Sequence, residues 1–475
     1  MRLVIFTCVV IAGMVTMLFE LAGARIIAPY FGTSHFVWTS VIGVILGSLS
    51  IGYWLGGYLA DRKKNVRILS SLFSLTSIFI LSTFLSKGLL LSTISTYIYN
   101  VKLGGLFSAL LLFAPASIGL GCIVPFANRF LLNNINHTGK TTGFIYALST
   151  IGSIVGTFLG GFYLIPLVGI NLVLCLCAGL LLFCSILLLK KINVLIIVNI
   201  LLLAYSLFLI SSNSEKHIVY ETNYSHVNVF DQRNKEGQNI RFLKVNNYIS
   251  SAIYTDTIDQ VYDYLKLFRI DRTLNPTFKK VLFIGGSACS YPRELLATYA
   301  DIEIDIIEID PMLIEIAHQY FKLPHDNRLH FYYEDGRTFL NRNTQKYDVI
   351  YIDAFNSHLS VPYQLTTVEA IQKVKKSLSK NGVVITNLLA TLQNGPKKFL
   401  LSELKTYQEI FNEVKTIRVN NETSKATLQN FLIIASNTPH DLQNFQHQKL
   451  ISLNTADSHV LTDNLAPVNY YLAKR

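Results

Sequence analysis

Residues 281–311 read VLFIGGSACSYPRELLATYADIEIDIIEIDP, and this stretch decides the fold of the second half of the chain. The apolar run Val281–Gly286 predicts a buried strand, and Tyr291–Tyr299 has the pattern of a helix. Ile302–Asp310 predicts a second strand, and a second helix over Pro311–Phe321 opens on a proline, which favours the first helical turn. Strands that alternate with helices are typical of a doubly wound, Rossmann-like α/β sheet.

The same alternation continues toward the C-terminus, with further strands predicted at Leu329–Glu334, Tyr347–Phe355 and Gly382–Leu388. Upstream the pattern changes to short alternating segments broken by turn residues, with a hairpin turn at Lys235-Glu236-Gly237. These segments predict a small antiparallel β-sheet. Its expected strands are His226–Phe230, Asn239–Val245 and Ser250–Tyr254.

Three acidic residues follow predicted strands of the α/β part, where ligands of such sheets bind. Glu308 lies about 20 residues beyond Gly286, a spacing typical of an acid that accepts hydrogen bonds from a ribose diol. Asp335, beside Gly336, is suited to accept from an adenine amino group, and Asp353 ends the fourth strand. Each acid alone is equally well explained as a helix cap. The three together favour a nucleoside site.

The composition of the 475-residue chain divides it into parts that face different solvents. Residues 1–211 are mostly apolar, 212–270 hold the predicted small sheet, and 271–475 hold the predicted α/β domain. The net charge of +11 is not gathered into a basic stripe, so nucleic acid is not an expected partner. Basic residues that flank membrane segments explain it better. No Cys/His spacing typical of zinc occurs, and no metal is expected.

The apolar part predicts an α-helical transmembrane bundle with the lipid bilayer as its partner, because a crossing needs about 20 apolar residues. Glycines at four-residue spacing in the second and fifth segments predict close helix packing. The segment Leu89–Tyr99 is too short to count as a crossing. Seven crossings are expected: Leu3–Leu21, Phe36–Ala60, Ile68–Leu85, Leu106–Phe126, Phe144–Leu167, Leu172–Leu189 and Val194–Ile210.

The side of the membrane follows less directly. Arg62, Lys63, Lys64 and Arg67 place the loop after the second crossing in the cytoplasm. Seven crossings then put the soluble part outside, whereas the nucleoside it is expected to bind is made inside. We expect a multi-pass inner-membrane protein with a cytoplasmic soluble part. Either one crossing is miscounted, with Leu89–Tyr99 the segment in question, or the biology of the protein is unusual.

Four motifs resemble, in order, those of the spermidine synthase family. The stretch Glu20–Gly32 resembles the membrane part of bacterial proteins that fuse a major-facilitator-like bundle to such a domain. The tail Leu461–Tyr470 is similar to that of the fused members. The four motifs are Val281-Leu-Phe-Ile-Gly-Gly286, Ile307-Glu308-Ile309-Asp310-Pro311, Glu334-Asp335-Gly336-Arg337 and Tyr347-Asp348-Val-Ile-Tyr351-Ile352-Asp353.

The resemblance implies specific roles. Asp353 would be the catalytic base, which takes the proton that an amine must lose as it attacks the carbon beside a sulfonium. Decarboxylated S-adenosylmethionine or S-adenosylmethionine would be the co-substrate, an amine the acceptor, and a homodimer a candidate assembly. The nucleoside would be bound by Gly285, Gly286, Glu308, Asp335 and Gly336, and the acceptor by Tyr224, Tyr262 and Asn356.

The chain departs from the family where amines are bound. Ala288 stands in place of the aspartate that binds the donor's amine. Tyr264 replaces a glutamate and Asn356 an aspartate on the acceptor side, and Ser225 replaces a glutamine. A membrane-anchored aminopropyltransferase is therefore the first interpretation. The alternatives are an S-adenosylmethionine-dependent transferase with another acceptor and a non-catalytic, nucleoside-binding transporter or sensor.

Overall fold

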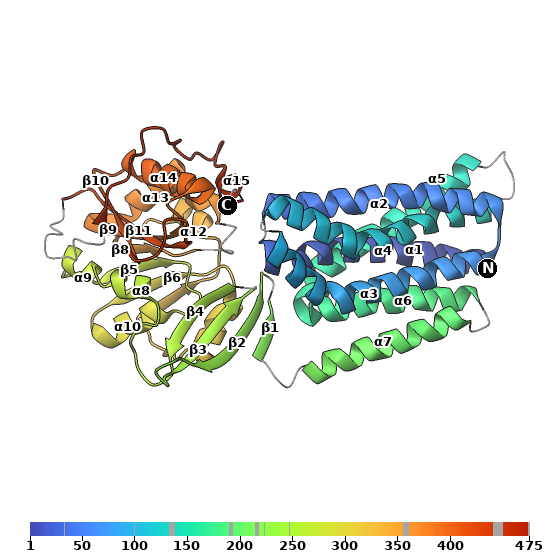
Figure 1. Ribbon diagram of the computed structural model, residues 1–475, viewed down its shortest axis with the longest axis horizontal. Coiled ribbons are helices and arrows are strands. Elements are labelled where there is room, and N and C mark those ends of the chain that lie inside the picture. Colours follow the sequence, from blue (N-terminus) through green and yellow to red (C-terminus); the bar gives the residue numbers. More distant parts are fainter. Residues whose placement is uncertain are drawn as a thin grey trace. The chain divides into compact units, whose positions relative to one another are not determined.

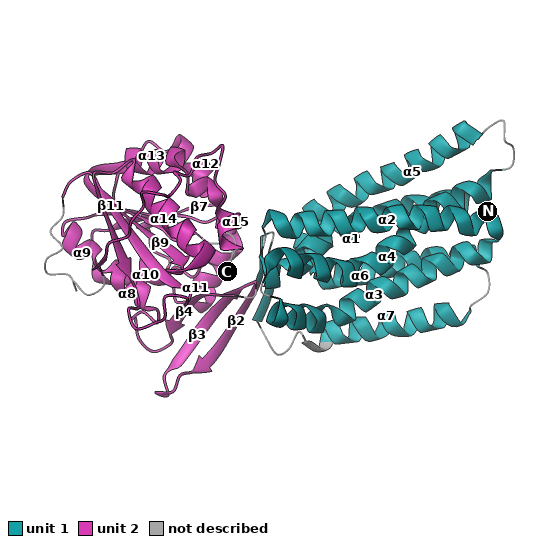
Figure 2. Cartoon of the chain, turned by 45° about the horizontal axis from the view of Figure 1, so that its top comes forward, with its two compact units in different colours: residues 1–226 teal, residues 227–475 magenta. Residues whose placement is uncertain are grey.

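A computed structural model describes residues 1–32, 34–98, 100–132, 138–189, 193–213, 218–222, 224–246, 248–354, 361–439 and 450–473. The chain divides into two compact units, residues 1–226 and 227–475 (Figure 2). Helices make up the first unit as far as Asn213, and two β-sheets with surrounding helices make up most of the second. The division into three domains at residues 211 and 270 stays a prediction.

The first unit contains a bundle of long apolar helices (Figure 1). Within the described residues, six helical stretches are long and apolar enough to cross a membrane, which supports a multi-pass membrane protein. Leu89–Tyr97 is not a separate element, because it continues the third helix. The helices are α1 (Arg2–Phe31), α2 (His35–Arg62), α3 (Val66–Tyr97), α4 (Val101–Leu131), α5 (Thr138–Leu159), α6 (Ile165–Leu188) and α7 (Val194–Asn213).

The expected count of seven separate crossings differs from the six stretches of the structure. The fifth stretch, Thr138–Leu188, has 51 residues and includes α5, a π-helical turn at Gly160–Leu164 and α6. A straight helix of that length would be more than twice as long as the hydrocarbon core of about 30 Å. Gly169, with φ 74° and ψ 166°, breaks it. Two of the predicted segments therefore lie in one stretch with an internal break.

Close helix packing is confirmed at some of the glycines. A Cβ on Gly52 or Gly56 of α2 would overlap α4 backbone atoms of Ile118 or Cys122. Gly152 and Gly156 of α5 approach the α1 backbone in the same way. Gly43 and Gly47 have open space where a Cβ would be, so their spacing does not mark a helix contact. Small residues bring helix backbones together where dispersion contributes to association in lipid.

The predicted small sheet is confirmed as a four-stranded sheet in the order β1-β2-β3-β4, with β2–β3 and β3–β4 antiparallel. Gly237 has φ 82° in the β2–β3 turn, and its N–H donates to the Asn234 carbonyl oxygen at 3.1 Å. The strands are β1 (Ile218–Glu221), β2 (His226–Arg233), β3 (Asn239–Val245) and β4 (Tyr248–Tyr254).

The larger sheet has eight strands in the order β12-β10-β11-β9-β8-β5-β6-β7. The parallel part from β9 to β7 confirms the Rossmann-like prediction. The sheet is mixed, because β11, β10 and β12 extend it with antiparallel pairs that were not predicted. Its strands are β5 (Lys280–Ile284), β6 (Glu303–Ile307), β7 (Leu329–Tyr332), β8 (Tyr347–Ile352), β9 (Leu378–Ala390), β10 (Glu413–Arg418), β11 (Gln429–Ser436) and β12 (Leu450–Ile451).

Alternating residues of these strands supply the core on the two faces of the sheet. Val281 and Phe283 pack in one cluster with α10 and α11, and Leu282 and Ile284 pack in the other with α12 to α14. The continuous apolar runs follow from burial on both faces. The helices of this unit are α8 (Asp263–Phe268), α9 (Asp271–Leu274), α10 (Ser290–Thr298), α11 (Pro311–Tyr320), α12 (Gly336–Arg342), α13 (Val368–Ser377), α14 (Asn394–Gln408) and α15 (Val468–Leu472).

Candidate active site

The candidate site begins where the strand order reverses. The chain runs from β5 outward to β6 and β7 and then returns to β8 on the other side of β5. Ligands of open α/β sheets bind at the carboxyl ends of strands at such a switch point. The predicted strands were slightly too long, because β5 ends at Ile284 and β8 at Ile352. Gly285 and Asp353 are thus the first residues beyond two neighbouring strands.

Gly285 allows a close approach at this point. Its φ is 92°, which favours glycine, and a Cβ there would overlap the carbonyl oxygen of Asp353. Its N–H donates to the Ile307 carbonyl oxygen at 2.9 Å, so the turn is tied to β6 as well. A Cβ on Gly286 would come within 2.8 Å of an Ile306 methyl group. At both positions neighbouring protein atoms leave no room for a side chain.

The Asp353 carboxylate is partly buried and held by two side chains from other elements. Tyr264 of α8 donates its hydroxyl hydrogen to Oδ2 at 3.2 Å, and Asn387 of β9 donates from Nδ2 to Oδ1 at 2.9 Å. Asn430 of β11 donates to the Asn387 amide oxygen at 2.9 Å, which sets the orientation of that amide. Burial raises the pKa of Asp353 above its usual value, and the two hydrogen bonds oppose this rise. A fixed carboxylate with a raised pKa is suited to accept a proton.

Glu308 lies directly after β6, as predicted, and is buried. Its Oε2 accepts hydrogen bonds from the backbone N–H groups of Gly286 and Ser287, both at 3.0 Å. Burial raises the pKa of Glu308, and the backbone hydrogen bonds oppose the rise. Glu308 therefore anchors the glycine-containing loop. Its Oε1 accepts from the Asp310 N–H at 3.2 Å, so three of about four acceptor positions of the carboxylate are used and one remains for a ligand hydroxyl.

Asp335 is the N-cap of α12, so the alternative of a helix cap holds for this acid. Its Oδ1 accepts from the N–H groups of Arg337 and Thr338 at 2.9 and 3.2 Å. Its other oxygen accepts from Gln364 at 3.1 Å. A Cβ on Gly336 would come within 2.6 Å of Ile284, so the start of α12 lies close to the end of β5. Capping fixes the carboxylate and does not use up its acceptor positions.

The loop after Gly286, which departs from the family's motif, is surrounded by serine hydroxyl groups of β4. The Ser287 hydroxyl is within 2.8 Å of the Ser250 hydroxyl and accepts from that of Ser251 at 3.0 Å. Ala288 is 1% exposed, and its N–H donates to the Ser251 hydroxyl oxygen at 3.4 Å. Hydroxyl groups therefore tie the loop to β4 of the small sheet, while the Glu308 carboxylate ties it to the end of β6.

The predicted acceptor side is only partly assembled in the described residues. Tyr262 stacks on Tyr264 with centroids 6.0 Å apart, and burial raises the pKa of Tyr262 to about 12. Tyr224 belongs to the other compact unit, where it is 49% exposed. Asn356 lies outside the described residues. The roles of these three residues stay predictions.

Some residues of the site were not predicted from the sequence. Asn387 and Asn430 lie in buried strands, where an amide side chain is uncommon. This unusual position is the feature of the sequence that could have identified them as site residues. The sequence marks Tyr264 only as a replacement of an acid, whereas in the structure its hydroxyl donates to Asp353. The C-terminal tail also docks here, because Asp463 accepts from Arg337 at 2.6 Å and from the Thr367 hydroxyl at 2.6 Å. Among the described residues no cluster of His, Cys, Asp or Glu is arranged to hold a metal ion.

Comparison with known proteins agrees with this architecture. A family model described as the spermine/spermidine synthase domain matches residues 266–444. A polyamine aminopropyltransferase of Vibrio vulnificus (strain CMCP6) is 30% identical over 208 residues, which cover 42% of this chain and 67% of that protein. Polyamine aminopropyltransferase 2 of Aquifex aeolicus (strain VF5) is 22% identical over 430 residues, which cover 85% of this chain and 82% of that one.

Among solved structures, a probable spermidine synthase from Corynebacterium glutamicum ATCC 13032 aligns with 21% identity and a TM-score of 0.42, over 48% of this chain and 83% of that one. The Vibrio relative carries the assignment, because at 30% identity two thirds of its length is matched. The chain therefore belongs to the spermine/spermidine synthase, or polyamine aminopropyltransferase, family, with an N-terminal region of long apolar helices.

Proposed function

We propose that this protein is a membrane-anchored aminopropyltransferase, which transfers a propylamine group from decarboxylated S-adenosylmethionine to an amine acceptor. The observation that carries the proposal is the Asp353 carboxylate. It lies beside Gly285 at the switch point of the sheet, is partly buried, and is held by Tyr264 and Asn387. The long apolar helices supply the anchor.

The reaction needs little beyond alignment and a proton acceptor. The acceptor's neutral amine attacks the propyl carbon bound to the sulfonium, so that a C–N bond forms as the C–S bond breaks. The electron pair of the broken bond goes to sulfur, and methylthioadenosine leaves as a neutral thioether. The new ammonium gives one proton to the Asp353 carboxylate. Because the leaving group is already activated, positioning of the two reactants is the main task of the protein.

Glu308 and Asp335 support the binding of the nucleoside part of the donor. Glu308 is fixed by the Gly286, Ser287 and Asp310 amides, and its remaining acceptor position suits a hydroxyl of the ribose diol. Asp335 is fixed as the cap of α12 and suits the adenine amino group. Preorganised acceptors need no rearrangement when the ligand arrives, which favours affinity.

A second candidate function uses intact S-adenosylmethionine, and Ala288 is the observation that favours it. An aspartate at this position would bind a donor amine and repel the carboxylate of intact S-adenosylmethionine. The Ala288 methyl group is buried, and the surrounding groups from Ser251 and Ser287 are neutral hydroxyls. The exposed Asp263 does not supply the missing charge, because its carboxylate is 65% exposed and pairs with Lys266 at 3.2 Å. We therefore infer weaker discrimination between the two donors. The replacement of acids by Tyr264 and Asn356 on the acceptor side reduces the negative charge available to a diamine, so we also infer weak or no activity with putrescine.

The test uses the full chain in detergent, supplied with each sulfonium nucleoside and a panel of amines. Release of methylthioadenosine with formation of the aminopropylated amine supports the first function. Asp353→Asn should abolish turnover and leave nucleoside binding within a few-fold. Asp263→Asn is a control, since that exposed carboxylate pairs only with Lys266 among the contacts described. Turnover that persists in Asp353→Asn removes this residue from the mechanism.

Donor choice is tested by competition between the two nucleosides in wild type, Ala288→Asp and Ala288→Asn. Asparagine matches aspartate in size without the charge, so a difference between the two variants reports electrostatics. Ala288→Asp should restore preference for the decarboxylated donor. A wild type that already prefers that donor strongly, with no change in Ala288→Asp, would refute the second candidate. Saturable binding without turnover of either donor would instead support a nucleoside sensor.

We also propose that the soluble part faces the cytoplasm, where sulfonium nucleosides are made. Cysteine labelling with a membrane-impermeant reagent tests this. A cysteine introduced at the exposed Lys235 should react only after the inner membrane is opened. Labelling of intact spheroplasts would place the domain outside.

A further inference from the structure

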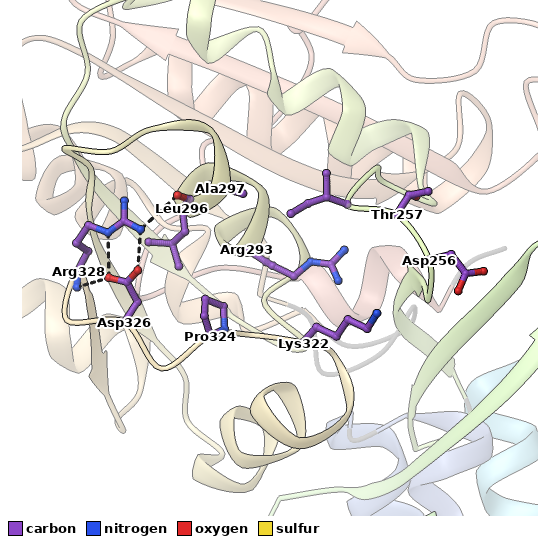
Figure 3. A pocket seen from close by; sticks show the side chains of 10 residues that line it. Asp256, Thr257, Arg293, Leu296, Ala297, Lys322, Pro324, Asp326 and Arg328 are labelled. Carbon is purple, nitrogen blue, oxygen red and sulfur yellow. Dashed lines mark hydrogen bonds and ion pairs between the residues drawn. The ribbon is translucent and has the colours of Figure 1, made fainter.

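A cavity of unit 227–475, away from the candidate active site, lies between the segment after β4, helix α10 and the turn after α11 (Figure 3). Its volume of about 460 Å³ is in the range of small-molecule sites. Ile258, Leu296 and Pro324 give it an apolar wall, and Arg293 and Lys322 give it positive charge. None of its lining residues belongs to the candidate active site.

Arg293 is the unusual residue of this cavity. It is only 5% exposed, and its Nη1 donates to the Phe321 carbonyl oxygen at a long 3.4 Å. Its Nε and Nη2 atoms have no hydrogen-bond partner among the described residues. Burial holds the pKa of Arg293 below its usual range, and the negative charge of the adjacent Glu294 offsets this only in part. The Glu294 carboxylate forms its ion pairs with Arg269 and Arg272, so Arg293 has no carboxylate bound to its guanidinium among the described residues.

Other arginines of the unit show what the Nε–Nη2 edge of a guanidinium binds. In Arg241, Arg269 and Arg328, Nε and Nη2 together donate to the two oxygens of one carboxylate. The six distances lie between 2.6 and 3.0 Å. This two-point pairing is the strong mode of recognition of carboxylate and phosphate by arginine. The same edge of Arg293 has no such partner.

Lys322 places a second cation next to Arg293. It follows α11 with φ 57°, and its ammonium donates to the Thr255 carbonyl oxygen. An ammonium has three donors, so two remain. Figure 3 shows the Arg293 and Lys322 side chains extending in the same direction, whereas Arg328 lies at the other end of the cavity, paired with Asp326 at 2.6 Å. Asp256 is the acid toward which the two cations extend.

We propose that this cavity binds a small oxyanion, a carboxylate or phosphate attached to a short apolar body. The oxyanion is bound by the Nε–Nη2 edge of Arg293 and by Lys322, and the carbon skeleton lies against Ile258, Leu296 and Pro324. The two Arg293 nitrogens are enclosed in the present side-chain arrangement, so binding includes a rotation of the guanidinium away from Phe321. This site is separate from the proposed transferase site and does not depend on it.

The test is calorimetry of the full chain in detergent with sodium phosphate and sodium butyrate, against sodium chloride at equal ionic strength. The two probes separate phosphate from carboxylate recognition. Wild type should bind at least one probe saturably, and a saturating concentration of methylthioadenosine should not displace it. Lys322→Gln should weaken binding by roughly fivefold or more. Lys279→Gln, an exposed lysine outside the cavity, should leave it unchanged.

Two further variants separate ligand binding from a structural role of Arg293. Arg293→Met should abolish binding without lowering the Tm of the ligand-free protein, because it removes an unpaired buried charge. Asp256→Asn should tighten binding, because it removes a negative charge that repels the oxyanion. If this variant instead lowers the stability of the ligand-free protein, Asp256 is the partner of Arg293. No saturable binding, displacement by methylthioadenosine, or unchanged binding in Arg293→Met would overturn the proposal.

Discussion

The hydroxyl group of Tyr264 should set the pH dependence of the proposed reaction. Tyr264 donates to Asp353 Oδ2 and so stabilises the carboxylate, as does Asn387 from the other side, while burial opposes both. In Tyr264→Phe the ring that stacks on Tyr262 stays, and only this hydrogen bond is lost. The pKa of Asp353 should rise. Because the base must be deprotonated to work, the acid limb of kcat/KM should move to higher pH.

The size of the shift follows from the geometry. A hydrogen bond to a charged group contributes about 1.5–3 kcal/mol. The oxygen–oxygen distance of 3.2 Å is long for a hydroxyl bound to a carboxylate, so the lower end of that range applies. At about 1.4 kcal/mol per pKa unit, the acid limb should move upward by about one unit.

The assay measures methylthioadenosine release by the full chain from about pH 4 to pH 10 at subsaturating substrate. Tyr299→Phe is the matched control, since the Tyr299 ring packs on Phe278, away from Asp353. Its limb should stay in place. An active Tyr264→Phe protein with an unmoved acid limb, or one that moves to lower pH, would refute Asp353 as the titrating base.

Three further predictions follow from the same geometry. Glu308→Gln should weaken nucleoside binding by roughly 1–3 kcal/mol in calorimetry, and a 2′,3′-dideoxy analogue that binds wild type as well as the parent would contradict a ribose contact. Gly285→Ala should reduce turnover severely, because its Cβ would overlap the Asp353 carbonyl oxygen. Gly237→Ala has a similar φ but open space around the Cβ, so it should cost only about 1 kcal/mol of stability. Equal effects of the two variants on thermal unfolding and activity would show that the close approach of Gly285 to Asp353 is unimportant. Burial raises the pKa of Asp271 to about 6, so between about pH 4 and 6 the folded protein keeps a proton on Asp271 that the unfolded chain has lost. The free energy of unfolding should therefore fall by up to about 3 kcal/mol as pH rises through this range. Asp271→Asn should remove this slope from a plot of Tm against pH, and an unchanged slope would contradict the role of Asp271.

Local pattern determined several features of this protein from the sequence alone. Runs of about 20 apolar residues predict helices long enough to cross a membrane, because the hydrocarbon core has a set thickness. Each of the apolar runs before Gly285, Glu308 and Asp353 predicts a strand, because a parallel strand that is buried on both faces is apolar throughout. The glycine or acid that follows the run predicts where the strand ends. The family motifs lie in these same short segments, so the sequence places Gly285, Glu308 and Asp353 directly after strands, while their roles in binding stay predictions.

Other features depend on packing between distant segments. The pairing of β8 with β5 brings Asp353 to Gly285, and α8 brings Tyr264 to Asp353 across 89 positions. The role of Asp335 as a cap, the break at Gly169 and the unpaired edge of Arg293 likewise depend on three-dimensional contacts. The residue pattern of a segment predicts which of its faces are buried and which are exposed to solvent. Strand order and side-chain partners are selected by the free energy of the whole packed domain, in which contacts far apart in sequence contribute together.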